Sequence, residues 1–240
     1  MRLLNDFDDH EFVLDVLKNG RTDLTESTVL DEHQFYTQKV AFYLVHMLTW
    51  CKQLHLGTEF LTNFDYSKKI EASRADHLVY NVENYLIRLH SIYDRALQLV
   101  NCVFHLCVSD EHTSHAVIVS NYKVQHRPAV VAKLKSLKKY LDSFAQDRHT
   151  LLHRHSLTSD ERLRRIEFFY IKNIDTVDRT EESAKNLRAF RANYLREYVV
   201  EKKAEFAKIN LKLAELLEEF FASLHAEYKG QRAEFAKRGL

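Results

Sequence analysis

SRADHLVYNVENYLIRLHSIYDRALQLVNCVFHLC, residues 73–107, is the stretch of sequence that decides the fold. Its apolar side chains recur at spacings of three and four residues, which is the pattern of one face of an amphipathic α-helix. This apolar face consists of Leu78, Val82, Tyr85, Leu89, Ile92, Ala96, Leu99 and Val103. Such a long stripe has to be buried against other elements, so we expect a long helix that packs in a larger core.

The rest of the chain has almost none of the residues that tight turns require. Only four Gly and one Pro occur among 240 residues, and a protein of many strands needs such residues at its turns. Hydrophobic residues make up 45% of the chain and charged residues 29%, the balance of a globular protein that buries a core without metals or disulfides. We therefore predict an all-α fold, an up-and-down bundle of about five to seven helices with a long C-terminal helix.

Stop and start signals place several helix boundaries. The first helix is expected to stop before Gly20. Thr28 with Asp31 resembles the cap of a second helix, which we expect to end at Gly57. Pro128 suits the first position of a helix, because the N–H that it lacks would have no partner there.

The C-terminal half carries two further start signals. Residues 159–161 (Ser-Asp-Glu) have the character of a cap with acids in the first turn. Residues 180–182 (Thr-Glu-Glu) open the last helix, which we expect to continue to about Lys229. The expected organisation is N-terminal helices in residues 1–72, a helical core in 73–175, and a long helix in 176–240 that serves as a dimer or partner arm.

Charge is distributed unevenly along the chain, although the formal net charge is only +1. Residues 1–33 carry three basic and nine acidic residues, a balance of −6, and residues 127–165 carry ten basic and four acidic residues, a balance of +6. A local basic segment is what binding to a phosphate chain requires. The alternative interpretation is a solvated helix face.

The cysteines and the hydropathy indicate a cytoplasmic protein. Cys51, Cys102 and Cys107 have no CxxC spacing and lie in apolar runs, so we interpret them as buried reduced thiols. The N-terminal stretch lacks the apolar core of a secretion signal. No window approaches the roughly 18 uninterrupted apolar residues of a membrane span, so none is expected.

One segment combines residue types that can do chemistry without a cofactor. It reads DRHTLLHRH, residues 147–155, at the end of the helix that Pro128 opens. His149 and His153 are one helical turn apart and share a face. Arg148 and His153 would diverge by roughly 140° on a regular helix, so a bent or frayed helix end is needed to bring both onto one substrate.

These residue types suit the cleavage of RNA without a metal ion. In that reaction the 2′-hydroxyl attacks its own phosphate, and groups are needed that move protons and stabilise the added negative charge. Histidine titrates near neutral pH and suits proton transfer. Arginine is permanently charged and can hold two phosphate oxygens. Glycine-rich phosphate loops, HExxH helices and GxSxG elbows do not occur in the sequence.

This segment resembles the motif of the HEPN superfamily (higher eukaryote and prokaryote nucleotide-binding domains). The family's mark is Arg, then a polar residue, then His after a gap of four to six residues, set in an all-α bundle. Arg148, the polar His149 and His153 match with a gap of four, and His155 matches as the gap-of-six alternative. The resemblance covers roughly residues 75–175, in which YNVENYLIRLHSIYDRALQLVN forms the companion helix.

The resemblance implies a metal-independent endoribonuclease, with a composite site formed where two motifs face one another in a homodimer. Many relatives act as toxins or in defence against phage, so an RNA substrate and an antitoxin or defence partner are expected, and no cofactor, metal or membrane. The catalytic candidates are Arg148, His153 and His149. The candidates for supporting residues are Asp94, Glu83 and His155. The candidates for RNA-binding residues are Arg154, Lys138 and Lys139.

Other interpretations of these residues remain open. The imidazoles can be exposed cations at a helix end, which the helix dipole favours. A zinc site on His149 and His153 has the right spacing for two ligands but no further ligand at a characteristic distance. His112 and His115 are expected to meet only water in a polar loop. The alternative function is a non-catalytic helical module that binds RNA or a protein partner.

Overall fold

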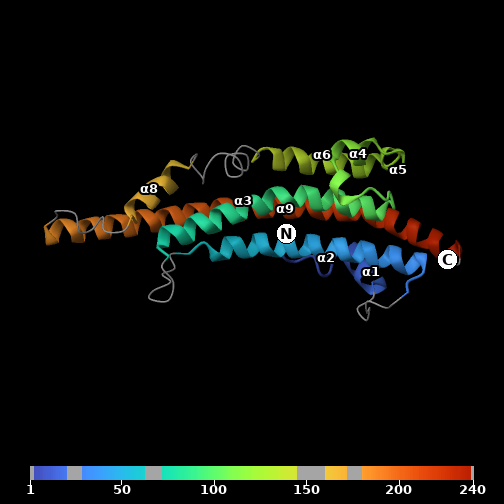
Figure 1. Cartoon of the computed structure of the whole chain (residues 1–240), viewed down its shortest axis with the longest axis horizontal. Coiled ribbons are helices and arrows are strands. Elements are labelled where there is room, and N and C mark those ends of the chain that lie inside the picture. Colours follow the sequence, from blue (N-terminus) through green and yellow to red (C-terminus); the bar gives the residue numbers. More distant parts are fainter. Residues whose placement is uncertain (1–2, 21–28, 63–71, 145–159, 172–179, 239–240) are drawn as a thin grey trace. The chain divides into compact units, whose positions relative to one another are not determined.

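A computed structural model of the chain describes residues 3–20, 29–62, 72–144, 160–171 and 180–238. These residues form eight α-helices, six of them nine residues or longer, and one short 3-10 helix, with no strand among them (Figure 1). The predicted all-α fold is confirmed. The elements are α1 (Glu11–Asn19), α2 (Glu32–Phe60), α3 (Arg74–Val103), η2 (Asp110–His112), α4 (His115–Ser120), α5 (Tyr122–Gln125), α6 (Pro128–Asp142), α8 (Glu161–Phe169) and α9 (Glu181–Arg238). None of the described helices has a stretch both long and apolar enough to cross a lipid bilayer.

Side-chain caps explain where several helices begin. The predicted start signal at residues 159–161 is followed by α8, whose cap is Asp160: its Oδ1 accepts a hydrogen bond from the Leu163 N–H at 3.0 Å, and position 159 lies outside the described residues. Pro128 opens α6, also as predicted. For α2 the cap is Asp31, whose Oδ1 accepts from the Gln34 N–H at 2.7 Å. The other half of the predicted cap, at position 28, lies outside the described residues.

The long C-terminal helix is present and is longer than predicted. Thr180 Oγ1 accepts a hydrogen bond from the Ser183 N–H at 3.3 Å at the start of α9. The helix runs to Arg238, past the expected end near Lys229. A single Gly230 does not stop it, because good helix formers follow and Phe235 is buried.

Two glycines mark close approaches between helices. Gly20 follows α1 as predicted, and a Cβ built on it would lie only 2.8 Å from the Cβ of Ala41. The predicted end of α2 at Gly57 is wrong, since the helix continues to Phe60. A Cβ on Gly57 would lie 3.3 Å from Cδ2 of Tyr85. This glycine therefore serves the packing of α2 on α3 rather than ending a helix.

The predicted apolar face of α3 is confirmed, since all eight of its residues are buried. The helix ends at Val103, earlier than expected, because His105 and Cys107 adopt positive φ angles of 47° and 57°. Asn101 closes the turn that follows: its Oδ1 accepts from the Val108 N–H at 3.1 Å and its Nδ2 donates to the Val108 carbonyl at 2.6 Å.

The prediction that all three cysteines are buried is wrong for Cys107, which lies in this turn. Cys51 and Cys102 are buried, as expected, and burial raises the pKa of each thiol to about 12. Cys107 is exposed, because the helix has already ended and the residue lies in the left-handed turn.

The contacts divide the chain into two compact units. Unit 1 consists of Met1–Gln53, His90–Ser143 and Asn210–Leu240, and unit 2 consists of Leu54–Leu89 and Phe144–Ile209. Because each of the three longest helices crosses a boundary in the sequence, α2, α3 and α9 supply residues to both units.

Unit 1 has an aromatic core. The Tyr36 ring lies 4.9 Å from the ring of Phe235 and is stacked with Tyr228 at 6.0 Å, both centroid to centroid. Its hydroxyl donates to the Val103 carbonyl at 2.9 Å, so a buried phenol has a hydrogen-bond partner. Phe221 of α9 packs edge-on against Phe7 at 5.2 Å. These contacts join α2, α3 and α9 with the N-terminal segment.

A ring stack and a polar cluster are among the contacts that hold unit 2 together. The rings of Tyr85 and Phe206 are parallel within 10°, with centroids 3.6 Å apart. At the N-terminus of α8, its cap Asp160 accepts a hydrogen bond from the Tyr198 hydroxyl at 3.0 Å and pairs with Lys202 at 3.3 Å. Burial raises the pKa of Asp160, but its hydrogen bond from Leu163 and the charge of Lys202 outweigh burial and hold that pKa below its usual value.

Candidate functional site

The residues predicted to be catalytic lie in a part of the chain that the structure does not describe, residues 145–159. This segment contains Arg148, His149 and His153, and also Arg154 and His155. It follows α6 and precedes the cap of α8. The catalytic and RNA-binding roles of these five residues therefore stay predictions.

Four of the predicted supporting and RNA-binding residues are described. Asp94 is exposed on the part of α3 that belongs to unit 1, and Glu83 is half-buried on the part that belongs to unit 2. On α6, Lys138 pairs with Asp142 at 2.5 Å, and Lys139 is exposed. The roles assigned to these four side chains also stay predictions.

Beside Asp94, α3 and α4 bring together a phenol and an imidazole. The Tyr93 hydroxyl is hydrogen-bonded to Nδ1 of His115. Burial lowers the pKa of His115, and the ammonium groups of Lys138 and Lys135 on α6 lower it further. The lowered pKa favours the neutral imidazole at neutral pH, and its Nδ1 shares one hydrogen bond with the phenol.

This pair contradicts the expectation that His112 and His115 meet only water. His115 is half-buried and hydrogen-bonded to Tyr93, and Nδ1 of His112 lies 2.8 Å from the Ser109 hydroxyl. The local sequence is polar, which suggested a solvated loop, but the structure forms α4 and directs one of the two imidazoles toward α3. A neutral imidazole can accept a proton and, once charged, donate one, which is what general acid–base chemistry requires.

Part of the basic charge on α6 is neutralised within unit 1. Arg127 forms an ion pair with Glu227, and Lys133 lies 2.7 Å from Glu219, both acids being on α9. The Lys133–Glu219 pair lowers the pKa of the Glu219 carboxyl. The net charge of +6 counted for residues 127–165 thus overstates the positive electrostatic potential that α6 presents to a phosphate chain.

Unit 2 contains a cavity with three arginines. Its volume is about 340 Å³, and its described lining is Ser73, Arg74, Tyr170, Arg188, Arg191 and Ala192. These residues come from the start of α3, the end of α8 and one face of α9. No local sequence pattern indicates this site. Only the spacing of Arg188 and Arg191 is visible in the sequence, since Arg74 is far from both along the chain.

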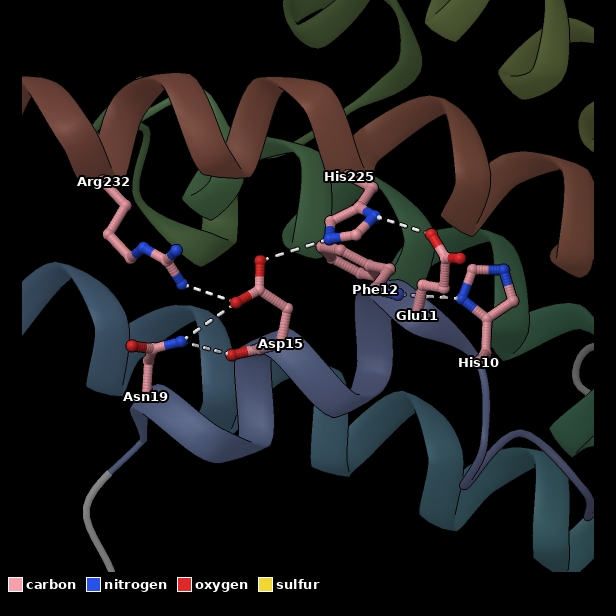
Figure 2. A network of polar contacts seen from close by, with 7 residues as sticks. All are labelled: His10, Glu11, Phe12, Asp15, Asn19, His225 and Arg232. Carbon is pink, nitrogen blue, oxygen red and sulfur yellow. Dashed lines mark hydrogen bonds and ion pairs between the residues drawn. The ribbon is translucent and has the colours of Figure 1, made fainter.

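A second group of polar side chains joins α1 to α9 in unit 1 (Figure 2). Asp15 accepts hydrogen bonds from Arg232 at 2.6 Å and from Nε2 of His225 at 3.1 Å, and Asn19 donates to it at 3.1 Å. The other nitrogen of His225 faces Glu11 at 3.8 Å. Here an arginine and a histidine converge, but on a carboxylate of the protein itself, which pairs with the arginine. We therefore interpret the group as a structural clamp.

In the part of the chain that the structure describes, no group of three or more His, Cys, Asp or Glu side chains lies close enough together to hold a metal ion.

Comparison with known families identifies the class of protein. The model of the HEPN_Cthe2314-like HEPN family matches residues 17–220, so the chain belongs to the HEPN family. The match confirms the resemblance read from residues 147–155 and extends well beyond residues 75–175, into α2 and α9. Membership indicates a nuclease-like or RNA-related role. No curated protein and no solved structure matches the chain at a significant level.

Proposed function

We propose that this protein is a metal-independent endoribonuclease. The observation that carries the proposal is the HEPN match over residues 17–220, because that span includes the motif Arg148–His153 in an all-α chain. The residue types of the motif supply what cleavage at a phosphate needs, a permanent cation and groups that titrate near neutral pH.

The proposed reaction is an internal transesterification of RNA. A neutral imidazole removes the proton of the 2′-hydroxyl, whose oxygen forms a bond to the adjacent phosphorus. The bond from phosphorus to the 5′-oxygen breaks, and a protonated imidazole gives that oxygen its proton. The products are a 2′,3′-cyclic phosphate and a 5′-hydroxyl. His153 serves proton transfer, His149 supports it, and Arg148 holds the phosphate and its transition-state charge.

The proposed assembly is a homodimer in which two copies of the motif face one another, and the proposed biological role is that of a toxin or phage-defence effector. Two copies would supply two His153 side chains, one for each proton transfer. Sedimentation analysis of the purified protein measures the assembly state, and a monomer at the concentrations that give activity would exclude the composite site.

Substitutions in the motif test the catalytic proposal. Arg148→Ala and His153→Ala proteins are expected to keep the helical circular dichroism of the wild type and to lose RNA cleavage, by at least about 100-fold for each residue. Arg164→Ala is the matched control, because this exposed arginine of α8 belongs to the same basic segment but not to the motif. His155→Ala decides between the two possible gaps of the motif.

The chemistry is tested by the product and by metal removal. Cleavage is expected to persist in EDTA and to leave a cyclic phosphate, detected by mass spectrometry of a short RNA product. The pH profile of kcat/KM is expected to be bell-shaped, since one imidazole has to be neutral and another charged. A strict metal requirement, or full activity of the Arg148→Ala protein, would rule out the proposed mechanism.

The alternative function, a non-catalytic module that binds RNA or a protein, is favoured by a different observation. Phe168, Ile171 and Phe190 of unit 2 are each more than half exposed, and apolar side chains of this kind are suited to a protein partner. Purified protein that binds RNA but leaves it intact at every pH from about 5 to 8, the range in which histidine titrates, would favour this alternative.

A further inference from the structure

A groove in unit 1 lies between the neighbouring helices α4, α5 and α6 (Figure 1). Its volume is about 430 Å³, and most of its lining is aliphatic. The described residues that line it are Val119, Gln125, Pro128, Val131, Ala132 and Lys135. Four of the six come from one face of α6, so the first two turns of that helix form the floor of the groove.

The chain around this groove carries an excess of cations. Residues 113–141 contain six lysines and arginines and no aspartate or glutamate. Three of these cations form ion pairs with acidic side chains: Arg127, Lys133 and Lys138. On α6 this leaves Lys135 and Lys139, which are exposed and form no ion pair within the described part of the chain. Their charges therefore remain available to an anion.

The two lysines extend the apolar floor along α6. Lys135 lines the groove, and Lys139 follows it by one helical turn, about 6 Å along the helix axis. None of the described lining residues is acidic. The groove thus joins an apolar floor to a positively charged edge, which suits a ligand that has both a flat apolar ring and an anionic group.

Helix α5 adds groups that suit a nucleobase. The amide of Gln125 has two donors and an acceptor, the groups that read the edge of a base. Tyr122 precedes it by three residues on the same side of α5, and its side chain is 73% exposed. The Tyr122 ring lies 4.1 Å from the ring of His126, whose Nδ1 is 2.8 Å from the Tyr122 carbonyl oxygen. An exposed aromatic ring of this kind is a surface on which a base can stack.

We propose that this groove binds one nucleotide of single-stranded RNA. The base lies on the apolar floor beside Gln125, and the phosphates on either side of it meet Lys135 and Lys139. A duplex keeps its bases stacked and paired, so only a single strand offers a base to the groove. Because the row of cations continues past the groove, it suits a continuous strand better than a free nucleotide.

This inference rests on the proposed function only in taking RNA as the ligand, and it does not require that the protein cuts RNA. The groove residues are separate in sequence from the motif Arg148–His153, so the two proposals have separate variants. Loss of cleavage in motif variants tests the first proposal, and loss of RNA binding in groove variants tests the second. Either can fail without the other.

Fluorescence anisotropy on the full chain measures the proposed binding. All proteins carry His153→Ala, so that the RNA stays intact if the protein is a nuclease. The probes are a short labelled single-stranded RNA of mixed sequence and a duplex of the same sequence. Each affinity is measured over a series of salt concentrations, because the slope of log K against log salt reports the number of phosphate contacts.

Lys135→Gln tests the phosphate contact. The side chain is exposed and has no ion pair, so its loss leaves the fold intact. We expect the salt slope for single-stranded RNA to become shallower by about 0.7, which corresponds to binding about fivefold weaker at about 0.1 M salt. Lys208→Gln is the matched control, an exposed lysine of α9 that also lacks an ion pair, and it is expected to bind within about twofold of the unsubstituted protein with the same slope.

Ala132→Gln tests the place of the base. This exposed alanine lines the groove, and glutamine is a good helix former that fills the groove without changing its charge. We expect binding of single-stranded RNA to weaken at least about fivefold, the effect of losing one stacked base, with an unchanged salt slope and no effect on the duplex. Ala189→Gln, at an exposed alanine of α9 outside the groove, is the matched control.

The two pairs of variants decide the proposal together. Weaker binding of single-stranded RNA by both groove variants, with the shallower slope confined to Lys135→Gln, supports it. Equal affinities of the Lys135→Gln and Lys208→Gln proteins, or of the Ala132→Gln and Ala189→Gln proteins, would overturn it. It is also overturned if Ala132→Gln weakens duplex binding as much as single-strand binding. No binding of single-stranded RNA by any of the proteins would overturn it as well and would favour a protein segment as the occupant of the groove.

Discussion

Replacing Asp15 with asparagine tests whether the clamp between α1 and α9 stabilises the protein (Figure 2). The carboxylate of Asp15 accepts three hydrogen bonds, two of them from side chains of α9, Arg232 and His225. Only 18% of the Asp15 side chain and 13% of the His225 side chain are exposed, so solvent screens these contacts less than it screens a surface ion pair. Asparagine keeps the size and one acceptor but removes the charge.

The expected loss of stability follows from this intermediate burial. An exposed ion pair contributes at most about 1 kcal/mol, and breaking a buried pair costs about 3–5 kcal/mol. A partly buried carboxylate with one close arginine lies between the two limits, so we expect the Asp15→Asn protein to lose about 2 kcal/mol. For a chain of this size, that loss lowers Tm by about 4–8 °C.

The effect of pH has a definite sign. Burial raises the pKa of Asp15, but the hydrogen bonds from Arg232 and His225 outweigh burial, and the pKa lies below its usual value. A carboxyl whose pKa is lower in the folded state stabilises that state fully above its unfolded pKa, about 3.9, and loses this contribution as pH falls through the folded pKa. The Tm difference between the two proteins should therefore be constant near neutral pH and shrink in acid below about pH 4.

Thermal unfolding followed by circular dichroism from pH 7 down to pH 3 measures both effects. Glu11→Gln is the matched control, because this carboxylate also faces His225 but is 87% exposed and 3.8 Å away, and its loss should cost less than about 1 kcal/mol. A stabilising role of the clamp is refuted if the Asp15→Asn protein melts within about 1 °C of the wild type at pH 7, or if the Tm difference between the two proteins does not narrow in acid.

Two further predictions concern α8 and the thiols. Asp160→Ala should remove the cap of α8 and the ion pair with Lys202, so the amides of α8 should exchange about 30-fold faster with solvent deuterium, the equivalent of about 2 kcal/mol. The control is Glu201→Gln, which removes an exposed partner of α8. Equal exchange rates in the two variants would contradict this prediction. Iodoacetamide should label one thiol per native chain at pH 8, that of Cys107, and Cys107→Ser should abolish the labelling, as shown by peptide mass spectrometry. Cys51 and Cys102 should react only after unfolding, because both thiols are buried and have pKa values of about 12.

The features of the fold that could be predicted from the sequence are those that depend on neighbouring residues. The apolar stripe of α3 follows from helical periodicity alone, and the starts of α6 and α8 follow from Pro128 and Asp160. Gly57 shows where such reasoning fails. Locally it is a stop signal, but its contact with Tyr85, a residue distant in sequence, decides its role.

The same difference between local patterns and tertiary contacts explains which candidate sites could be predicted from the sequence. The motif of residues 147–155 could be recognised because it is a local pattern of residue types, and the family match supports the class of protein. The three-arginine cavity could not be recognised, because Arg74 and Arg188 meet only through tertiary packing. His115 was assigned to solvent because its neighbours are polar, whereas its partner Tyr93 lies on another helix.

The contact between Gly57 and the ring stack of unit 2 also restricts how this chain can diverge. A methyl group at position 57 would sit 3.3 Å from the Tyr85 ring, and that ring already lies face to face with Phe206. Because the stack with Phe206 already holds the ring, the ring has little room to yield to an added methyl group. We therefore expect positions 57, 85 and 206 to change together among homologous sequences, with alanine at the first accompanied by a smaller side chain at one of the others.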